Sequence, residues 1–256
     1  MLPKISIIIP TLNQARFIEE TIQSILTQNY PHLELIVLDG GSSDGTLEIL
    51  HKYADSLTWI SEPDEGQVDA INKGLKMVSG EVVAYLNSDD VYLPDTLLTV
   101  GKYFYDHPEC QILTGKCINI DENGVETRVL IKLYKNFWLM LGIDKCLTVL
   151  DYVSQPSTFW RAGLKDSIGL FDDQYRNAMD YDYWLRIIRD HKLHFINKYL
   201  AKFRIYPTSI TSSNSRAQYD DEFRVASRYS TSLQIFLHKI HAGVSCWIYE
   251  HFFNRK

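Results

Sequence analysis

The chain has 256 residues, of which 45% are hydrophobic and 23% are charged, and its formal net charge is -6 at pH 7. This composition fits one large α/β domain or two small ones, and the negative charge argues against a nucleic-acid-binding protein with a basic surface. The apolar run at the N-terminus is too short for a signal peptide or a membrane helix, so we expect a cytoplasmic protein.

Strands and helices are expected to alternate over the first hundred residues. Apolar, β-branched runs typical of buried strands are separated by apolar stripes at helical spacing, which start near Phe17, Thr46 and Val68. The expected strands are Ile5 to Ile9, Leu33 to Leu38, Leu57 to Ile60 and Val82 to Leu86. This alternation predicts a Rossmann-like α/β fold, with a mostly parallel sheet flanked by helices.

The regular alternation fades after about residue 107. We expect a hairpin around Asn123-Gly124, with strands in Leu113 to Asp121 and Glu126 to Leu133, and a short buried segment from Phe137 to Ile143. Further along the chain the pattern predicts a helix, a strand and a C-terminal helix. They are Asp180 to Arg189, a strand within Leu193 to Ile205, and a helix from Leu233.

Polar residues follow each of the first four expected strands. Ligands of such sheets bind beyond the carboxyl ends of the strands, so these residues predict a binding site. They are Thr11 and Asn13, Asp39, Glu62 to Asp69, and Asn87 to Asp90. For Gln67 and Asp69, a structural role in the first turn of a helix is an equal alternative.

Two adjacent aspartates, Asp89 and Asp90, end the fourth expected strand. Their mutual repulsion favours a bound cation, and oxygen ligands without nearby sulfur suit Mg²⁺ or Mn²⁺. The alternative is that one of them caps the helix near Pro94. At the end of the second strand, Asp39 can accept a hydrogen bond from a base N–H or a ribose hydroxyl.

The order of these motifs resembles that of the family 2 glycosyltransferases with the GT-A fold. The first half carries Pro10-Thr11-Leu12-Asn13, Asp39-Gly40-Gly41-Ser42-Ser43-Asp44-Gly45-Thr46, Glu65-Gly66-Gln67 through Asn72-Lys73-Gly74, and Asn87-Ser88-Asp89-Asp90. The second half adds Gln155-Pro156-Ser157, Gly169-Leu170-Phe171-Asp172 and the segment Met179 to Arg186. The resemblance covers roughly residues 4–215.

The resemblance implies an inverting transfer of a sugar from a nucleoside diphosphate, UDP by family frequency, to an acceptor hydroxyl. The acceptor is expected to be a saccharide or lipid-linked, as in cell-surface polysaccharide or glycolipid assembly. Residues 1–215 are expected to form the GT-A domain, with a nucleotide-binding half (1–106) and an acceptor half (107–215). Residues 216–256 are expected to form a C-terminal helical extension.

The resemblance also implies roles for single residues. Asp90 is expected to be the direct metal ligand, Asp89 to lie nearer the ribose, and Asp180 to be the catalytic base. The implied donor-binding residues are Pro10, Thr11, Asn13, Asp39, Gln67, Asp69, Asn87, Ser88 and Asp89. Three positions depart from the family pattern, namely Asn87 in place of Asp, Met179 in place of Glu, and Tyr206 in place of His.

Several alternatives stay open on the sequence. Asp180 begins a helix and can instead be an N-cap, and Asp182 is a fallback base whose other role is a salt bridge with Arg186. A nucleotidyltransferase or a catalytically silent nucleotide-sugar-binding relative would share the scaffold. A nicotinamide-dependent dehydrogenase is excluded, because the first strand is not followed by a glycine-rich turn.

The expected C-terminal helix from Leu233 is amphipathic, with Lys239, His241 and the closing Arg255-Lys256 beside its apolar side. Such a helix can rest on a membrane surface, which would place the protein at the inner face of the plasma membrane. The alternative is a helix that packs on its own domain or on a second subunit of a homodimer.

Overall fold

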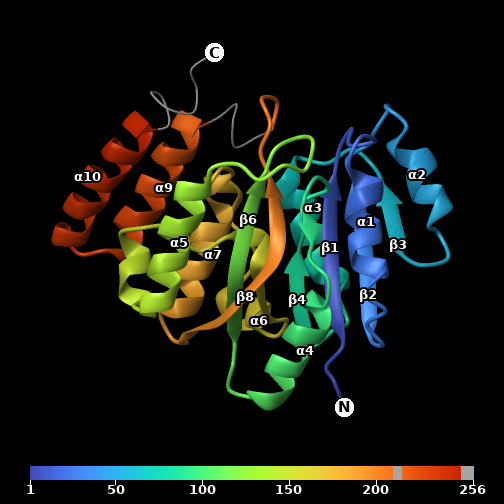
Figure 1. Ribbon diagram of the computed structural model, residues 1–256, viewed down its shortest axis with the longest axis horizontal. Helices are drawn as coiled ribbons and strands as arrows, with labels where there is room; N and C mark the ends of the chain where they lie inside the picture. Colours follow the sequence, from blue (N-terminus) through green and yellow to red (C-terminus); the bar gives the residue numbers. More distant parts are fainter. Residues whose placement is uncertain (210–214, 249–256) are drawn as a thin grey trace.

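The structure, a computed structural model, describes residues 1–209 and 215–248. An eight-stranded sheet with the order β3-β2-β1-β4-β7-β6-β8-β5 is flanked by helices (Figure 1). The strands are β1 (Ile5–Thr11), β2 (Leu33–Asp39), β3 (Thr58–Ser61), β4 (Val82–Tyr85), β5 (Val91–Tyr92), β6 (Ile112–Ile120), β7 (Thr158–Arg161) and β8 (Leu193–Arg204). The expected Rossmann-like α/β architecture is confirmed.

The first half of the sheet is parallel, as the sequence predicts. β1 pairs with β2 and β4, and β2 pairs with β3. Every residue of β1 is buried, because helices cover both faces of this part of the sheet. The register places Thr11 directly opposite Asp39, so both strands end at the same edge.

The helices of the first half follow the strands closely. They are α1 (Ile18–Leu26), α2 (Thr46–Lys52), α3 (Gln67–Met77) and α4 (Thr96–Asp106). Gly74 allows α3 to pack closely on β1, because a Cβ atom there would lie 2.6 Å from Cγ2 of Ile8. The family motif that includes Gly74 therefore has a packing role.

The second half of the sheet is mixed. β7 is antiparallel to both β4 and β6, β8 is parallel to β6, and β5 is antiparallel to β8. The helices of this half are α5 (Val129–Leu141), α6 (Leu164–Ile168), α7 (Met179–Ile188), α9 (Ser215–Tyr229) and α10 (Ser232–Ile248). Three short 3₁₀ turns, Asp144–Thr148, Gln155–Ser157 and Asp173–Tyr175, lie between them.

Two expectations for this half are wrong. The hairpin around Asn123-Gly124 is limited to one bridge between Ile120 and Glu126, after which Val129–Leu141 forms a helix. The segment from Phe137 to Ile143 is mostly exposed rather than buried, since Phe137 is 57% exposed and Ile143 is 45% exposed, and only Leu139 is buried. The outer side of α5 is apolar, and an apolar run of this length can be mistaken for a strand or a buried segment. Only the tertiary packing shows that this run is a helix with an exposed side.

The expected C-terminal helix is confirmed as α10. Figure 1 shows α5, α9 and α10 together at the end of the molecule away from β3. Contacts link α10 to α9, and α9 to α7. Arg255 and Lys256 lie outside the described residues. Among the helices described here, none combines the length and the apolar composition needed to cross a membrane.

Candidate active site

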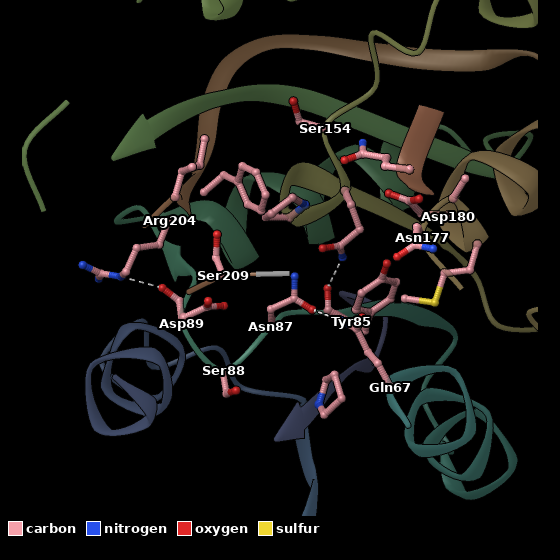
Figure 2. A pocket seen from close by; sticks show the side chains of 18 of the residues that line it. Gln67, Tyr85, Asn87, Ser88, Asp89, Ser154, Asn177, Asp180, Arg204 and Ser209 are labelled. Atoms are coloured by element: carbon pink, nitrogen blue, oxygen red, sulfur yellow. Dashed lines mark hydrogen bonds between the residues drawn. The ribbon is translucent and has the colours of Figure 1, made fainter. Parts of the chain in front are cut away.

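A cavity of about 530 Å³ lies at the carboxyl ends of β1 and β4 and extends to α7 and α9. The predicted site residues that line it are Pro10, Thr11, Gln67, Asn87, Ser88, Asp89 and Asp180. The predicted site residues that do not line it are Asn13, Asp39, Asp69, Asp90 and Asp182. Figure 2 shows Asp89 beside Arg204 on one side of the pocket and Asp180 beside Asn177 on the other, with Asn87 between them.

Asp39 organises the loop that follows β2. Its buried carboxylate accepts hydrogen bonds from the backbone N–H groups of Gly41 (3.0 Å) and Ser42 (2.9 Å) and from the hydroxyl of Ser61 (2.6 Å). The hydroxyl of Ser42 also donates to Asp39 and accepts from the backbone N–H of Asn13 (2.7 Å). Asp39 and Asn13 therefore hold the loops after β1 and β2 together beside the pocket.

Thr11 presents an unpaired polar atom to the cavity. Its side chain is only 5% exposed, and its Oγ1 has no hydrogen-bond partner. A buried hydroxyl without a partner is costly, and such a group in a pocket is a natural contact for a ligand.

Asn87 links the third helix to the end of β4. Its Oδ1 accepts from Nε2 of Gln67 (2.6 Å), and its Nδ2 donates to Oδ2 of Asp90 (3.2 Å). Gln67 therefore belongs to the pocket wall. Asp69 instead accepts from the backbone N–H of Glu65 (3.2 Å) and pairs with Lys73 (3.2 Å), which supports the structural alternative for this residue.

Asp90 points into the protein rather than into the pocket. It is fully buried, and its Oδ1 accepts from the backbone N–H of Arg204 (2.8 Å). Burial, followed by the charge of Asp89, raises its pKa well above the usual value. The carboxylate at the pocket belongs to Asp89, whereas Asp90, the expected direct metal ligand, does not line the cavity.

Asp89 is held by residues from the far end of the chain. The hydroxyl of Tyr206 donates to its Oδ2 (3.0 Å), and Nε of Arg204 donates to its backbone carbonyl (2.7 Å). Burial raises the pKa of Asp89 despite the hydrogen bond from Tyr206. The same burial, with the charge of Asp89, raises the pKa of Tyr206 to about 12, so this residue remains a neutral donor.

Asp180 lies at the start of α7 and faces the cavity from the side opposite Asp89 (Figure 2). Its Oδ1 accepts from the backbone N–H of Tyr181 (2.9 Å). Burial, and next the charge of Asp151, raise its pKa to about 6. A carboxylate with a raised pKa in a cleft is suited to accept a proton near neutral pH.

Asp182, the fallback base, does not line the cavity. Its carboxylate is 1% exposed and accepts from Nε of Arg186 (2.8 Å) and from the hydroxyl of Tyr229 (2.9 Å). The salt bridge with Arg186, which was the alternative role, is confirmed. Arg186 in turn donates to the carbonyls of Ile168 (2.6 Å) and Leu170 (2.8 Å). This part of the family motif therefore fixes the loop before α7.

Sequence reasoning missed the carboxylates that surround Asp180. Asp151 and Glu222 line the same cavity, and Oδ1 of Asp151 is buried without a hydrogen-bond partner. Burial, followed by the charge of Asp151, raises the pKa of Glu222 to about 8. Neither residue follows a strand or lies in a family motif, and α9, which carries Glu222, begins where the GT-A domain was expected to end.

Gln155, from the motif Gln155-Pro156-Ser157, lies in the same wall. Its Nε2 donates to the carbonyl of Tyr85 (2.7 Å), whereas its Oε1 is buried without a partner. The sequence singled out this motif without assigning it a role, and the structure places it between β4 and α7 in the pocket.

Comparison with known proteins agrees with the geometry. The family model described as glycosyl transferase family 2 matches residues 6–167, more than half of the chain. The chain belongs to glycosyl transferase family 2. It is therefore a glycosyltransferase, and the resemblance of its motifs to this family is confirmed.

Two relatives extend this family assignment. The chain is 29% identical over 237 residues to an uncharacterized glycosyltransferase of Rickettsia prowazekii, which covers 86% of this chain and 70% of the relative. It is 31% identical over 189 residues to a PGL/p-HBAD biosynthesis glycosyltransferase of Mycobacterium bovis, covering 72% of this chain and 69% of the relative.

Two solved structures share the fold. One is S. aureus TarS 1-349 in complex with UDP-GlcNAc, with a TM-score of 0.68, 20% identity, and coverage of 97% of this chain and 73% of TarS 1-349. The other is the mannosyltransferase PcManGT from Pyrobaculum calidifontis in complex with GDP-Man and Mn²⁺, with a TM-score of 0.70, 21% identity, and coverage of 99% and 71%. These likenesses confirm the GT-A fold.

Proposed function

We propose that this family 2 glycosyltransferase transfers a sugar from a nucleoside diphosphate to an acceptor hydroxyl with inversion at the anomeric carbon. One observation carries the proposal. A single cavity has the unpaired Thr11 hydroxyl and the Asp89 carboxylate at one end and Asp180 at the other. This arrangement supports a donor subsite at the edge of the parallel strands and an acceptor subsite next to α7.

The donor subsite is supported by the loops after β1 and β2. Thr11 offers a hydroxyl for a base or ribose, and Asp39 holds the neighbouring loop in place rather than facing the pocket. TarS was solved with UDP-GlcNAc and PcManGT with GDP-Man, which is consistent with a nucleotide-sugar donor here. We retain UDP as the proposed nucleotide.

The residues at the end of β4 fit a Mg²⁺ or Mn²⁺ ion that is shared with the donor. Within residues 1–209 and 215–248, no three acidic, His or Cys side chains are grouped so as to hold a metal by themselves. These ions are commonly held by one or two carboxylates together with substrate phosphates. Asp89 supplies a half-buried, pocket-facing carboxylate for this role, and Asp90 supports it from inside the protein. When bound, the ion neutralises charge on the leaving diphosphate.

Asp180 is the proposed general base. Above pH 6 its carboxylate is mostly ionised and can take the proton of the acceptor hydroxyl as the hydroxyl oxygen bonds to the anomeric carbon. The bond from that carbon to the diphosphate oxygen breaks in the same displacement. Asp180 and Asp89 face the cavity from opposite sides, which supports attack opposite the leaving group and therefore inversion.

The acceptor is proposed to be saccharide or lipid-linked, in the assembly of a cell-surface glycan. The support is the similarity to the PGL/p-HBAD biosynthesis glycosyltransferase.

The test is release of nucleoside diphosphate from UDP-, dTDP- and GDP-sugars in the presence of Mn²⁺. The wild type should release nucleoside diphosphate from one of these three donors. Release should be slow when water is the acceptor and faster with a suitable acceptor. Asp180→Asn should abolish this release, and the control Asp166→Asn, an exposed residue of α6, should retain it. If the wild type binds a donor but releases nothing with any acceptor, the chain is a silent relative and the proposal is wrong.

A further inference from the structure

Exposed apolar side chains are concentrated on two helices. Of the 21 large hydrophobic residues that are exposed within the described chain, 13 lie on α10, on α5 or directly after α5. The most exposed include Leu130 (76%), Met140 (62%) and Phe137 (57%) on α5, and Leu233 (67%), Phe236 (59%) and Ile240 (51%) on α10. We call this surface the apolar face. Contiguous exposed apolar surface of this kind marks an interaction site.

The spacing of these residues gives each helix one apolar stripe that points away from the protein. Leu233, Phe236 and Ile240 recur at intervals of three and four residues, as do the exposed residues of α5. The opposite sides of both helices are attached to the domain. Leu139 of α5 is buried, and His238 of α10 is 1% exposed with its Nδ1 2.9 Å from the carbonyl of Val149. The outward direction of the stripes is therefore fixed by this packing.

The two stripes belong to one surface. The hydroxyl of Tyr134 on α5 lies 2.8 Å from Nε2 of His241 on α10, and their rings stack with centroids 5.8 Å apart. Burial lowers the pKa of His241 to about 4, so the ring is neutral at this junction. Figure 1 shows both helices at the same end of the molecule.

The charges on these helices are of one sign. The chain has 32 acidic residues, yet neither Val129–Leu141 nor Ser232–Ile248 contains one. The helices carry Lys132, Lys135 and Lys239 instead, and Lys132 pairs with Glu126 just before α5. Lys135 lines the cavity and the Lys132 side chain is only 12% exposed, so Lys239 is the exposed cation of the two helices. An apolar surface with an exposed cation and no acidic residue on either helix is complementary to an anionic lipid surface.

The apolar face also adjoins the candidate active site. Ile131 and Lys135 of α5 line the cavity, whereas Leu130 and Phe137 of the same helix are exposed. One helix therefore separates the pocket from the outer surface. A bilayer in contact with α5 would lie next to the acceptor end of the cavity, where Asp151, Asp180 and Glu222 are found.

We propose that the apolar face formed by α5 and α10 docks on an anionic lipid bilayer and presents the cavity to an acceptor carried in that bilayer. Presentation of the cavity to an acceptor rests on the proposed function, whereas docking on the bilayer does not. A second copy of the chain fits the face less well. A two-fold dimer would pair the face with itself, and neither helix carries an acidic residue that could pair with Lys239 of the other copy.

The test is cosedimentation of the full chain with vesicles of phosphatidylcholine mixed with phosphatidylglycerol, and with vesicles of phosphatidylcholine alone. The variant Leu130→Glu/Phe236→Glu places charges at two outward positions, so the fold should be unaffected. The matched control Tyr105→Glu/Met77→Glu changes two exposed apolar residues on α4 and α3. Nucleotide binding by calorimetry is measured for every variant.

The wild type and the control should bind anionic vesicles more strongly than neutral ones, and Leu130→Glu/Phe236→Glu should bind at least about tenfold more weakly with unchanged nucleotide binding. The proposal is overturned if the wild type does not bind anionic vesicles, or if the variant binds them equally well. It is also overturned if the wild type forms a dimer that this variant dissociates and no vesicle binding is seen. Failure of nucleotide binding in the wild type would count against the proposed function and leave the docking result standing.

Discussion

The two ends of the cavity are built differently. At the donor end, the acidic side chains Asp39 and Asp90 accept hydrogen bonds from backbone N–H groups and do not line the cavity. At the acceptor end, Asp151, Asp180 and Glu222 line the cavity together, and the pKa of each is raised by burial.

The donor end is suited to hold a ligand in place, and the acceptor end is suited to react with one. The backbone donors fix the positions of Asp39 and Asp90 and of the loops that carry them, which suits a site that must position a nucleotide. A buried carboxylate among others binds a proton more readily, which suits a site that accepts one. The ends therefore differ in where their carboxylates point: Asp151, Asp180 and Glu222 face the cavity, whereas Asp39 and Asp90 hold the loops beside it.

The largest expected effect comes from Asp180 and its neighbour on α7. Asp180→Asn removes the proposed base and should lower kcat by about 10²- to 10⁴-fold, the usual contribution of general base catalysis, without loss of thermal stability. Asp182→Asn should instead lower the melting temperature, because it weakens the buried pairing with Arg186, while kcat per folded molecule stays near wild type. Steady-state kinetics and thermal melting distinguish the two. Equal losses of kcat in both variants would contradict a catalytic role for Asp180 and a structural role for Asp182.

A smaller effect is expected at Thr11. Thr11→Val removes a buried hydroxyl without a partner, so stability should be kept or slightly increased. Loss of one ligand hydrogen bond should weaken nucleotide binding by about 1 kcal/mol, or roughly fivefold in Kd. The matched control is Thr96→Val, because its hydroxyl donates to the carbonyl of Leu200 (2.6 Å) away from the cavity. Thr96→Val should lose stability and keep its nucleotide affinity. Weaker nucleotide binding by Thr96→Val, with unchanged binding by Thr11→Val, would count against the donor subsite.

The smallest expected effect is a shift in pH dependence. Asp180 is protonated below its pKa of about 6, so kcat/KM should fall as the pH is lowered through that value. The charge of Asp151 is the second cause of that raised pKa, after burial. Asp151→Asn should therefore move the acidic limb of the pH profile to lower pH. Asp55→Asn, an exposed residue, should leave the limb unchanged, and a limb that does not move in Asp151→Asn would show that burial alone raises the pKa.

The same contrast explains what the sequence could predict. In the first half, each strand and helix has an apolar period of its own, and polar residues follow the strands directly, so the parallel sheet was predicted correctly. Thr11 and Asp89, which were predicted to bind the donor, lie in the pocket wall. The direction of a side chain within a pair was not predictable. Asp90 turns inward because the backbone of Arg204, more than a hundred residues away, supplies its donor.

The second half depends on contacts that no local pattern records. The apolar run of α5 has an exposed outer stripe, so the usual inference from hydrophobicity to burial was wrong. Glu222 reaches the cavity through the packing of α9 on α7, whereas Asp151 reaches it from the segment between the turns Asp144–Thr148 and Gln155–Ser157. Burial in this assembly raises the pKa of both. The domain boundary at residue 215 remains a prediction, although α9, which begins there, contributes to the pocket wall.

The most direct test of the donor end is calorimetric titration of UDP with and without Mn²⁺ into the wild type, Asp89→Asn and Asp90→Asn, with thermal melting as a check on folding. The account predicts that Mn²⁺ strengthens UDP binding to the wild type, that Asp89→Asn abolishes this gain, and that Asp90→Asn retains most of it. A gain that survives in Asp89→Asn but disappears in folded Asp90→Asn would contradict the assignment of Asp89 as the pocket carboxylate. Absence of any gain in the wild type would contradict a metal-dependent donor site.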